Sequence, residues 1–221
     1  MSSRRLPGKV LRPLCGKPAL QYVTERLARC RTLEGAVVAT SVDPSDDPVQ
    51  ALCSALNVDC HRGPLENVAR RYLDAVEARG LDAFVRVSGD SPLIDHALVD
   101  RAVDLFRSGR WDVVTNVFPR CFPAGQSVEV VSAEALKRAL DVISTADELE
   151  HVTVFFYRQR EDFRIHNMTS EEDHREVHLS LDTEADAASI EAIIGHMTRP
   201  HWEYSWQEVV ALQPVAPKAS P

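Results

Sequence analysis

The chain has 221 residues, 44% of them hydrophobic, which is enough to bury the core of one sizeable α/β domain. Its formal net charge of −8, from 25 basic and 33 acidic residues, excludes the basic surface of a general nucleic-acid-binding protein. The five cysteines form no Cys-x-x-Cys pair, which argues against a disulfide framework or a zinc knuckle and favours a reducing cytoplasm. Since no stretch approaches the ~18 consecutive apolar residues of a membrane span, we expect no membrane partner.

The amino end places Arg4, Arg5 and Lys9 around a Leu-Pro-Gly turn at 6–8. Three interpretations compete: a twin-arginine export signal, a flexible tail, and a phosphate-binding loop whose supporting strand is missing. An export signal needs an apolar run of roughly 7 to 15 residues after the arginines. Here residues 10–20 are interrupted by proline, glycine and basic side chains. The export signal is therefore disfavoured, and the other two interpretations remain open on this stretch alone.

Short valine-rich runs alternate with longer segments of helical period in the first half, which is typical of strands and crossover helices in a largely parallel sheet. The predicted strands are 35–41, 58–63, 82–90 and 112–117. The predicted helices are 48–56, 65–80 and 96–109, the last capped by Asp95.

In the second half the strands become hairpin-like, which predicts a mixed, mostly parallel sheet. Strands are predicted at 127–131, 163–168 and 177–182, and helices at 132–142, 148–160 and 184–197. The segment 213–221 is proline-rich without periodicity, so we expect a disordered tail after a single domain at 1–212.

Two aspartates follow predicted strands, at the sheet edge where open α/β folds bind their ligands. Asp90 follows Ser88 and Gly89, and Asp182 ends the segment 177–182. From spacing alone an ordinary turn explains Asp90, and a helix N-cap explains Asp182. Two such carboxylates beside a basic loop also suit a magnesium-bound triphosphate, because carboxylates hold the ion and cations neutralise the phosphate oxygens.

Several motifs follow one another in a characteristic order: SSRRLPGKVL at 2–11, GDSPLID at 89–95, EHVT at 150–153 and LDTEAD at 181–186. In this order they resemble the spore-coat polysaccharide type of cytidylyltransferase, a relative of the enzymes that make CMP-sialic acid and CMP-3-deoxy-manno-octulosonate. The resemblance spans roughly 1–212. It implies a three-layer, Rossmann-like nucleotide-diphospho-sugar transferase fold. It also implies transfer of CMP from CTP to a sugar, expected to be acidic, with release of pyrophosphate for surface polysaccharide or glycan biosynthesis.

The resemblance also assigns residues to roles. Asp90 and Asp182 match the family's Mg²⁺ ligands, and Arg5 and Lys9 match cations that neutralise the departing pyrophosphate. The expected nucleotide-binding residues are Ser3, Arg5, Lys9, Arg62, Asn67, Arg71, Ser88 and Gly89. The expected sugar-binding residues are Arg120, Gln126, Glu129, Glu150 and His151. For Arg62 and Arg71 a solvated surface charge is an equal alternative, and for His151 a structural hydrogen bond is.

The chain departs from the family pattern in two places. The family's first strand and its Ala-Arg are missing ahead of the loop, so we expect the DNA upstream of Met1 to encode an apolar strand. On the sugar side, the departures are Ala124, Ser127, Leu149, Val154 and His178. They leave a second function open: a non-catalytic nucleotide or sugar-nucleotide binding protein.

The relatives also suggest a homodimer. Trp202, Tyr204 and Trp206 could lie at its interface, although core packing is the commoner fate of large aromatic side chains.

Overall fold

The computed structural model describes residues 5–213. The prediction for Ser3, and most of the predicted disordered tail, fall outside these residues. Among the described residues no helix is both long and apolar enough to cross a membrane.

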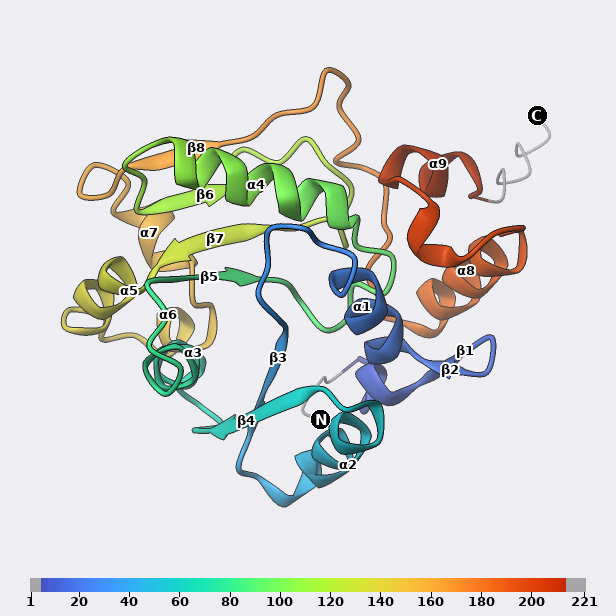
Figure 1. Cartoon of the computed structure of the whole chain (residues 1–221), viewed down its shortest axis with the longest axis horizontal. Helices are drawn as coiled ribbons and strands as arrows, with labels where there is room; N and C mark the ends of the chain where they lie inside the picture. The colour runs from blue at the N-terminus through green and yellow to red at the C-terminus, as the bar shows by residue number, and fades with distance from the viewer. Residues whose placement is uncertain (1–4, 214–221) are drawn as a thin grey trace.

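The strands form three separate groups (Figure 1). β1 (Pro13–Leu14) and β2 (Lys17–Pro18) make an antiparallel hairpin. β3 (Val37–Ser41) and β4 (Asp59–Gly63) make a parallel pair. The main sheet has the order β5-β7-β6-β8 and consists of Ala83–Arg86, Glu129–Ser132, Val113–Thr115 and Ile165–Asn167. β7 is antiparallel to β5 and β6, whereas β6 and β8 are parallel, so the sheet is mixed as predicted.

Helices cover both faces of the main sheet. Val114 and Val130 point to a core that includes α4 (His96–Ser108), whereas Val113 and Val131 point to one that includes α3 (Val68–Glu77) and α5 (Ala133–Leu140). Since neighbouring strand residues face opposite sides, the arrangement has three layers. The remaining helices are α1 (Ala19–Leu27), α2 (Asp47–Leu56), α6 (Ala146–Glu150), α7 (Val154–Arg158), α8 (Glu184–Gly195) and α9 (Trp206–Ala211), with short 3₁₀ helices at Lys9–Leu11, Pro44–Asp46 and His201–Glu203.

Three sequence predictions differ from this structure. The analysis missed α1, because prolines and glycines just before it hid the stripe of Leu20, Val23 and Leu27. The predicted helix 148–160 is two short helices, α6 and α7. The predicted strand 177–182 makes only one isolated bridge, between Ala124 and His178, because its neighbour is a loop rather than another strand.

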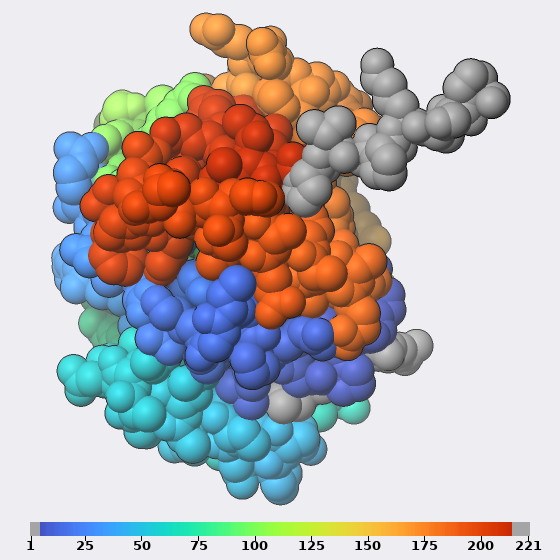
Figure 2. All heavy atoms as spheres, turned by 90° about the vertical axis from the view of Figure 1, so that its right-hand side faces the viewer, coloured from blue at the N-terminus to red at the C-terminus, as the bar shows by residue number. Residues whose placement is uncertain are grey.

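The carboxyl-terminal elements lie against the amino-terminal segment, as Figure 2 shows for α8 and α9 over the blue elements near residue 20. Tyr204 and Trp206 are 8% and 4% exposed, so these two aromatic residues pack in the core. Trp202 is only half-buried, with the Arg29 guanidinium 4.4 Å from its ring centroid.

Arg26 joins α1 to both of these regions. Its fully buried guanidinium donates hydrogen bonds to the backbone carbonyls of Ile94, His201 and Tyr204, the last at 2.6 Å. Burial lowers its pKa to about 10, although Asp95 opposes the shift. Arg26 therefore remains charged at neutral pH and satisfies three carbonyls that lie in separate loops.

Replacing Arg26 with methionine should lower the free energy of unfolding by about 2 kcal/mol, because similar volume is kept while buried carbonyls lose their donor. Urea denaturation followed by circular dichroism measures this change. Arg29→Met, one position outside the buried network, serves as the control and should change stability by less than about 0.5 kcal/mol. Equal effects of the two substitutions would contradict this role for Arg26.

Candidate active site

Lys9 brings two distant carboxylates together. Its Nζ donates to Asp90 Oδ2 and, at 2.9 Å, to Asp182 Oδ1, although these residues are 81 and 173 positions away in the chain. Each of the three side chains is less than one-fifth exposed. Gly8, just before Lys9, has φ 71°, a left-handed conformation that glycine adopts without strain. The turn at 6–8 thus directs Lys9 toward the two aspartates.

Backbone contacts fix both aspartates. The Leu181 amide donates to the Asp90 carbonyl at 2.8 Å, so the loop after β5 and the segment before α8 lie side by side. Thr183, and not Asp182, is the N-cap of α8, where its hydroxyl and Asp186 form a capping box. The helix-cap explanation of Asp182 is therefore wrong. Asp90 does lie in a turn, but its carboxylate faces Lys9.

The charges of this cluster support one another. Burial alone would lower the pKa of Lys9, but its hydrogen bonds and charge interactions with Asp90 and Asp182 raise it overall. Burial raises the pKa of Asp182, and Lys9, Arg5 and Ser180 together lower it overall. Both groups are therefore charged at neutral pH. Arg5 pairs with Asp182 at 3.1 Å while its side chain stays 66% exposed, so it can also reach a bound anion.

The donor set suits a hard divalent cation. Asp90 and Asp182 both bond to one ammonium nitrogen, so one small cation can contact both carboxylates. A second set, His178, Asp182 and Asp186, offers one atom each within 4.8 Å of one another. Asp186 already accepts hydrogen bonds from the capping box, which leaves Asp90 and Asp182 as the better pair.

The expected nucleotide residues fall into two groups. Arg71 lines a cavity of about 660 Å³, its Nε is buried without a hydrogen-bond partner among residues 5–213, and burial lowers its pKa. Gly63 permits this position, because a Cβ there would lie 2.8 Å from Arg71 Cγ. Arg62, in contrast, ties the end of β3 to α2 through the Ser41 carbonyl and Asp47.

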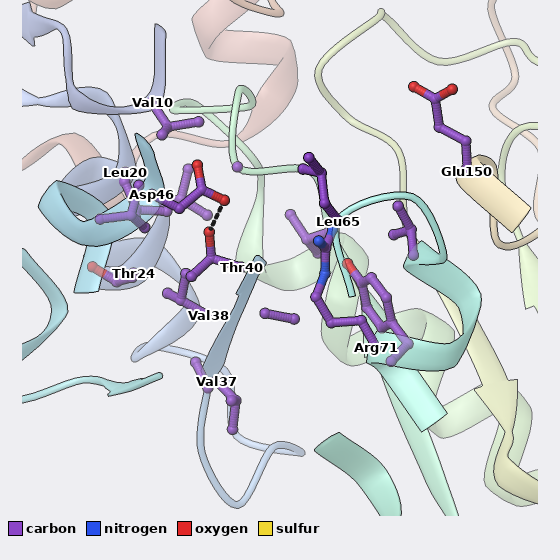
Figure 3. Close-up of a pocket in the computed structure, with 18 of the residues that line it drawn as sticks. Val10, Leu20, Thr24, Val37, Val38, Thr40, Asp46, Leu65, Arg71 and Glu150 are labelled. Carbon is purple, nitrogen blue, oxygen red and sulfur yellow. Dashed lines mark hydrogen bonds between the residues drawn. The ribbon is translucent and has the colours of Figure 1, made fainter. Parts of the chain in front are cut away.

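Asn67 is the N-cap of α3 and accepts from the Arg70 amide. Gly89 lines the same cavity as Arg71, and Ser88 accepts the Ser91 amide in the turn that carries Asp90. A Cβ on Gly89 would lie 3.4 Å from Val10 Cγ1, so the glycine allows the amino-terminal loop to pack closely there. Figure 3 shows Val37, Val38 and Thr40 on one side of the cavity and Leu65 and Arg71 on the other.

The expected sugar residues are not brought together. Gln126 is fully buried and holds the Asp95 amide and the Leu93 carbonyl, at 2.9 and 2.7 Å. Glu129 is 2% exposed and bonds to Arg86 and Tyr157. These two side chains therefore stabilise the interior in this structure rather than face a ligand.

The other three expected sugar residues are more accessible. Arg120 is half-buried, with its pKa lowered by burial, and donates to Ser127 Oγ at 3.0 Å. Glu150 is exposed at the rim of the cavity, and exposed His151 lies 3.7 Å from Asp147. Of the five expected residues, Glu150 is the one that lines the cavity beside Arg71.

The sequence analysis missed two functional neighbours. Ser180 Oγ donates to Asp182 Oδ2 at 3.2 Å and contacts His178 Nε2 at 3.0 Å, so it orients the carboxylate. Tyr157 stacks on Phe118, with ring centroids 4.8 Å apart, and bonds to Glu129. The alternation of His178, Ser180 and Asp182 was a usable signal, because side chains two apart in an extended segment share a face. Nothing comparable marked Tyr157.

The comparison with known proteins agrees with this geometry. A sequence profile described as cytidylyltransferase matches residues 1–198. The chain belongs to the cytidylyltransferase family. The solved structure of a cytidylyltransferase from Leptospira borgpetersenii is similar to it with a TM-score of 0.90 and 29% identity, over 96% of this chain and 89% of that one. The three-layer, Rossmann-like fold is thereby confirmed.

Two curated relatives of this cytidylyltransferase carry functional names. The spore coat polysaccharide biosynthesis protein SpsF of Bacillus subtilis is 30% identical over 202 residues, which are 87% of this chain and 82% of that protein. The 3-deoxy-manno-octulosonate cytidylyltransferase 2 of Hydrogenovibrio crunogenus is 28% identical over 155 residues, 69% of this chain and 62% of that protein. The family assignment made from the sequence is confirmed.

Proposed function

We propose that this cytidylyltransferase transfers CMP from CTP to the hydroxyl of an acidic sugar and releases pyrophosphate, in the cytoplasm, for surface polysaccharide or glycan biosynthesis. The observation that carries the proposal is the convergence of Lys9, Asp90 and Asp182 at one point. A buried lysine between two carboxylates at the ends of a sheet provides both a cation for phosphate oxygens and oxygen ligands for a metal ion. The names of the two curated relatives support the sugar and its place in polysaccharide synthesis.

In the proposed reaction the sugar oxygen forms a bond to the α-phosphorus of CTP. The bond from that phosphorus to the bridging oxygen breaks, the electron pair leaves with pyrophosphate, and the hydroxyl proton passes to solvent. Lys9 and Arg5 neutralise the charge that grows on the leaving group, as fixed cations in a shielded site do. Arg71, with its unpartnered buried Nε, donates to the nucleotide.

Asp90 and Asp182 are the residues that would hold Mg²⁺. When bound, the ion supplies charge neutralisation to the triphosphate oxygens. Lys9 occupies the space between these carboxylates in the structure. The ammonium group is therefore free to bond to phosphate oxygens once an ion takes the carboxylates.

Pyrophosphate release tests the proposal. The purified protein is incubated with CTP, Mg²⁺ and each of a panel of acidic sugars, such as 3-deoxy-manno-octulosonate and sialic acid, with neutral sugars as controls. We expect release only with CTP and an acidic sugar, together with a CMP-sugar detectable by mass spectrometry. Release without any sugar, or with neutral sugars alone, would contradict the acidic acceptor.

The second candidate is a non-catalytic binding protein, and one observation favours it: Gln126 and Glu129, expected on the sugar side, are buried in the interior. Such a protein would bind CTP or the CMP-sugar without releasing pyrophosphate. Measuring CTP binding and pyrophosphate release on the same preparation distinguishes the two. Binding without release from any tested sugar favours the binding protein.

Lys9→Met is expected to weaken CTP binding by about 10-fold while changing CMP binding little, because a lost charge-assisted hydrogen bond is worth about 1.5 kcal/mol and the outer phosphates are absent from CMP. Isothermal calorimetry with both nucleotides measures this. Lys17→Met is the matched control, since Lys17 pairs with Glu25 and not with the two aspartates. Equal weakening of CTP and CMP would place Lys9 away from the outer phosphates.

A further inference from the structure

Two strands of the structure have an open edge. β3 bonds to β4 along one edge and β5 bonds to β7 along one edge, and no described strand pairs with the opposite edge of either. In Figure 1, β3 lies between β4 and the four-stranded sheet. Unpaired strand edges bind other strands readily, because each presents a row of free backbone donors and acceptors.

A cavity lies where a strand between these edges would run. The 660 Å³ cavity is lined by residues 36–40 of β3 and its approach and by Val87 and Gly89 after β5. Its other walls come from Leu20, Val23 and Leu27 of α1 and from Val68 and Tyr72 of α3. The cavity is thus bounded by strand edges and by one helix on each face, as the place of an internal strand is in a three-layer fold.

Burial along the strands points the same way. All residues of β6 are buried, whereas all four residues of β5, and the first three of β3, are only half-buried. Ala83, Phe84, Val85, Val37 and Val38 are apolar and occupy the middle of the fold, so their partial exposure marks surface that lacks a neighbour.

The amino end of the described chain lies at this cavity. Val10, next to Lys9, lines it and approaches Gly89. Arg5 pairs with Asp182 nearby. A segment joined ahead of residue 1 can therefore enter the cavity from the sheet edge that carries Asp90 and Asp182.

We propose that this cavity is a strand-binding slot whose occupant is an apolar β-strand of about five residues joined to the amino end of the chain. The occupant is a strand because both flanking edges offer backbone hydrogen bonds. It is apolar at successive positions because α1 and α3 present apolar side chains from both faces. Five residues correspond to the length of β3.

The test compares three versions of the full chain: the chain as given, the chain with Ile-Val-Val-Ile-Val ahead of Met1, and the chain with Gly-Ser-Gly-Ser-Gly there. The apolar extension should raise the melting temperature by about 10 °C, and the Gly/Ser extension should leave it unchanged. Hydrogen exchange should slow in β3 and β5 only with the apolar extension. An unchanged melting temperature, or the same rise with both extensions, would overturn the proposal.

A second variant locates the effect. Val38→Lys places a charge in the wall of the slot, at a side chain that is only half-buried without an occupant. It should remove most of the gain from the apolar extension while changing the unextended chain by a few degrees at most. A gain that survives Val38→Lys would place the extension elsewhere. A gain that depends on protein concentration and comes with dimers would mean that the strand enters a second copy, which also overturns the proposal.

Discussion

Asp182→Asn and Asp90→Asn are each expected to lower the turnover of CTP by about 100-fold, the size of effect seen when one electrostatic contact to a transition state is lost. An amide oxygen can still coordinate an ion, but it contributes no negative charge. Since both carboxylates bond to Lys9, each change also removes half of the charge that balances this ammonium. Steady-state pyrophosphate release at saturating CTP measures the loss.

Both variants should keep the fold, which circular dichroism and thermal melting can confirm. Asp182 does not cap α8, because Thr183 does. Glu184→Gln is a matched control, since Glu184 lies two residues further on and pairs with Arg12 at 2.6 Å, away from Lys9. Turnover within a factor of two of the parent in either aspartate variant would remove that carboxylate from the mechanism.

Gly125→Ala is expected to lower the free energy of unfolding by about 4 kcal/mol, the sum of a strained backbone and an overpacked contact. Gly125 has φ 89°, and a Cβ there would lie 2.6 Å from the carbonyl carbon and oxygen of Leu179. That neighbour is backbone, so it cannot rotate away. The bonds from Ala124 to Val177 and Leu179, at 2.9 and 2.8 Å, would have to separate.

This change should also reduce activity, because Leu179 leads directly to Ser180 and Asp182. Gly195→Ala, at the end of α8, is the control: no described atom lies within 4 Å of a Cβ there, so stability should stay equal or rise slightly. Chemical denaturation of both variants measures the difference. A Gly125→Ala protein as stable as the parent would show that the loop and the segment before α8 separate freely.

The sequence predicted much of this fold because its signals were local. Asp95 and Gly109 bracket α4 within one residue, and alternating valines mark β6. α1 was missed because prolines at 13 and 18 hid its apolar stripe. The bridge at His178 depends on pairing with a loop 54 positions away, a contact that no local pattern encodes.

The candidate site divides in the same way. Residues on the amino-terminal loop and at strand ends were predictable, since motif order and sheet topology both place Lys9, Asp90 and Asp182 at one edge. Gln126 and Glu129 were not, because their partners, among them Leu93 and Arg86, come from separate elements. Whether a polar side chain faces a ligand or the interior depends on packing that a motif does not specify.

Calorimetric titration of CTP with and without Mg²⁺ tests the central claim most directly, using the parent protein and the Asp90→Asn and Asp182→Asn variants. If the two carboxylates hold the ion that binds the triphosphate, Mg²⁺ should tighten CTP binding to the parent by at least about 10-fold, and each substitution should remove most of this gain. The same Mg²⁺ dependence in the parent and in both variants would contradict the account, because Asp90 and Asp182 would then serve only to hold Lys9.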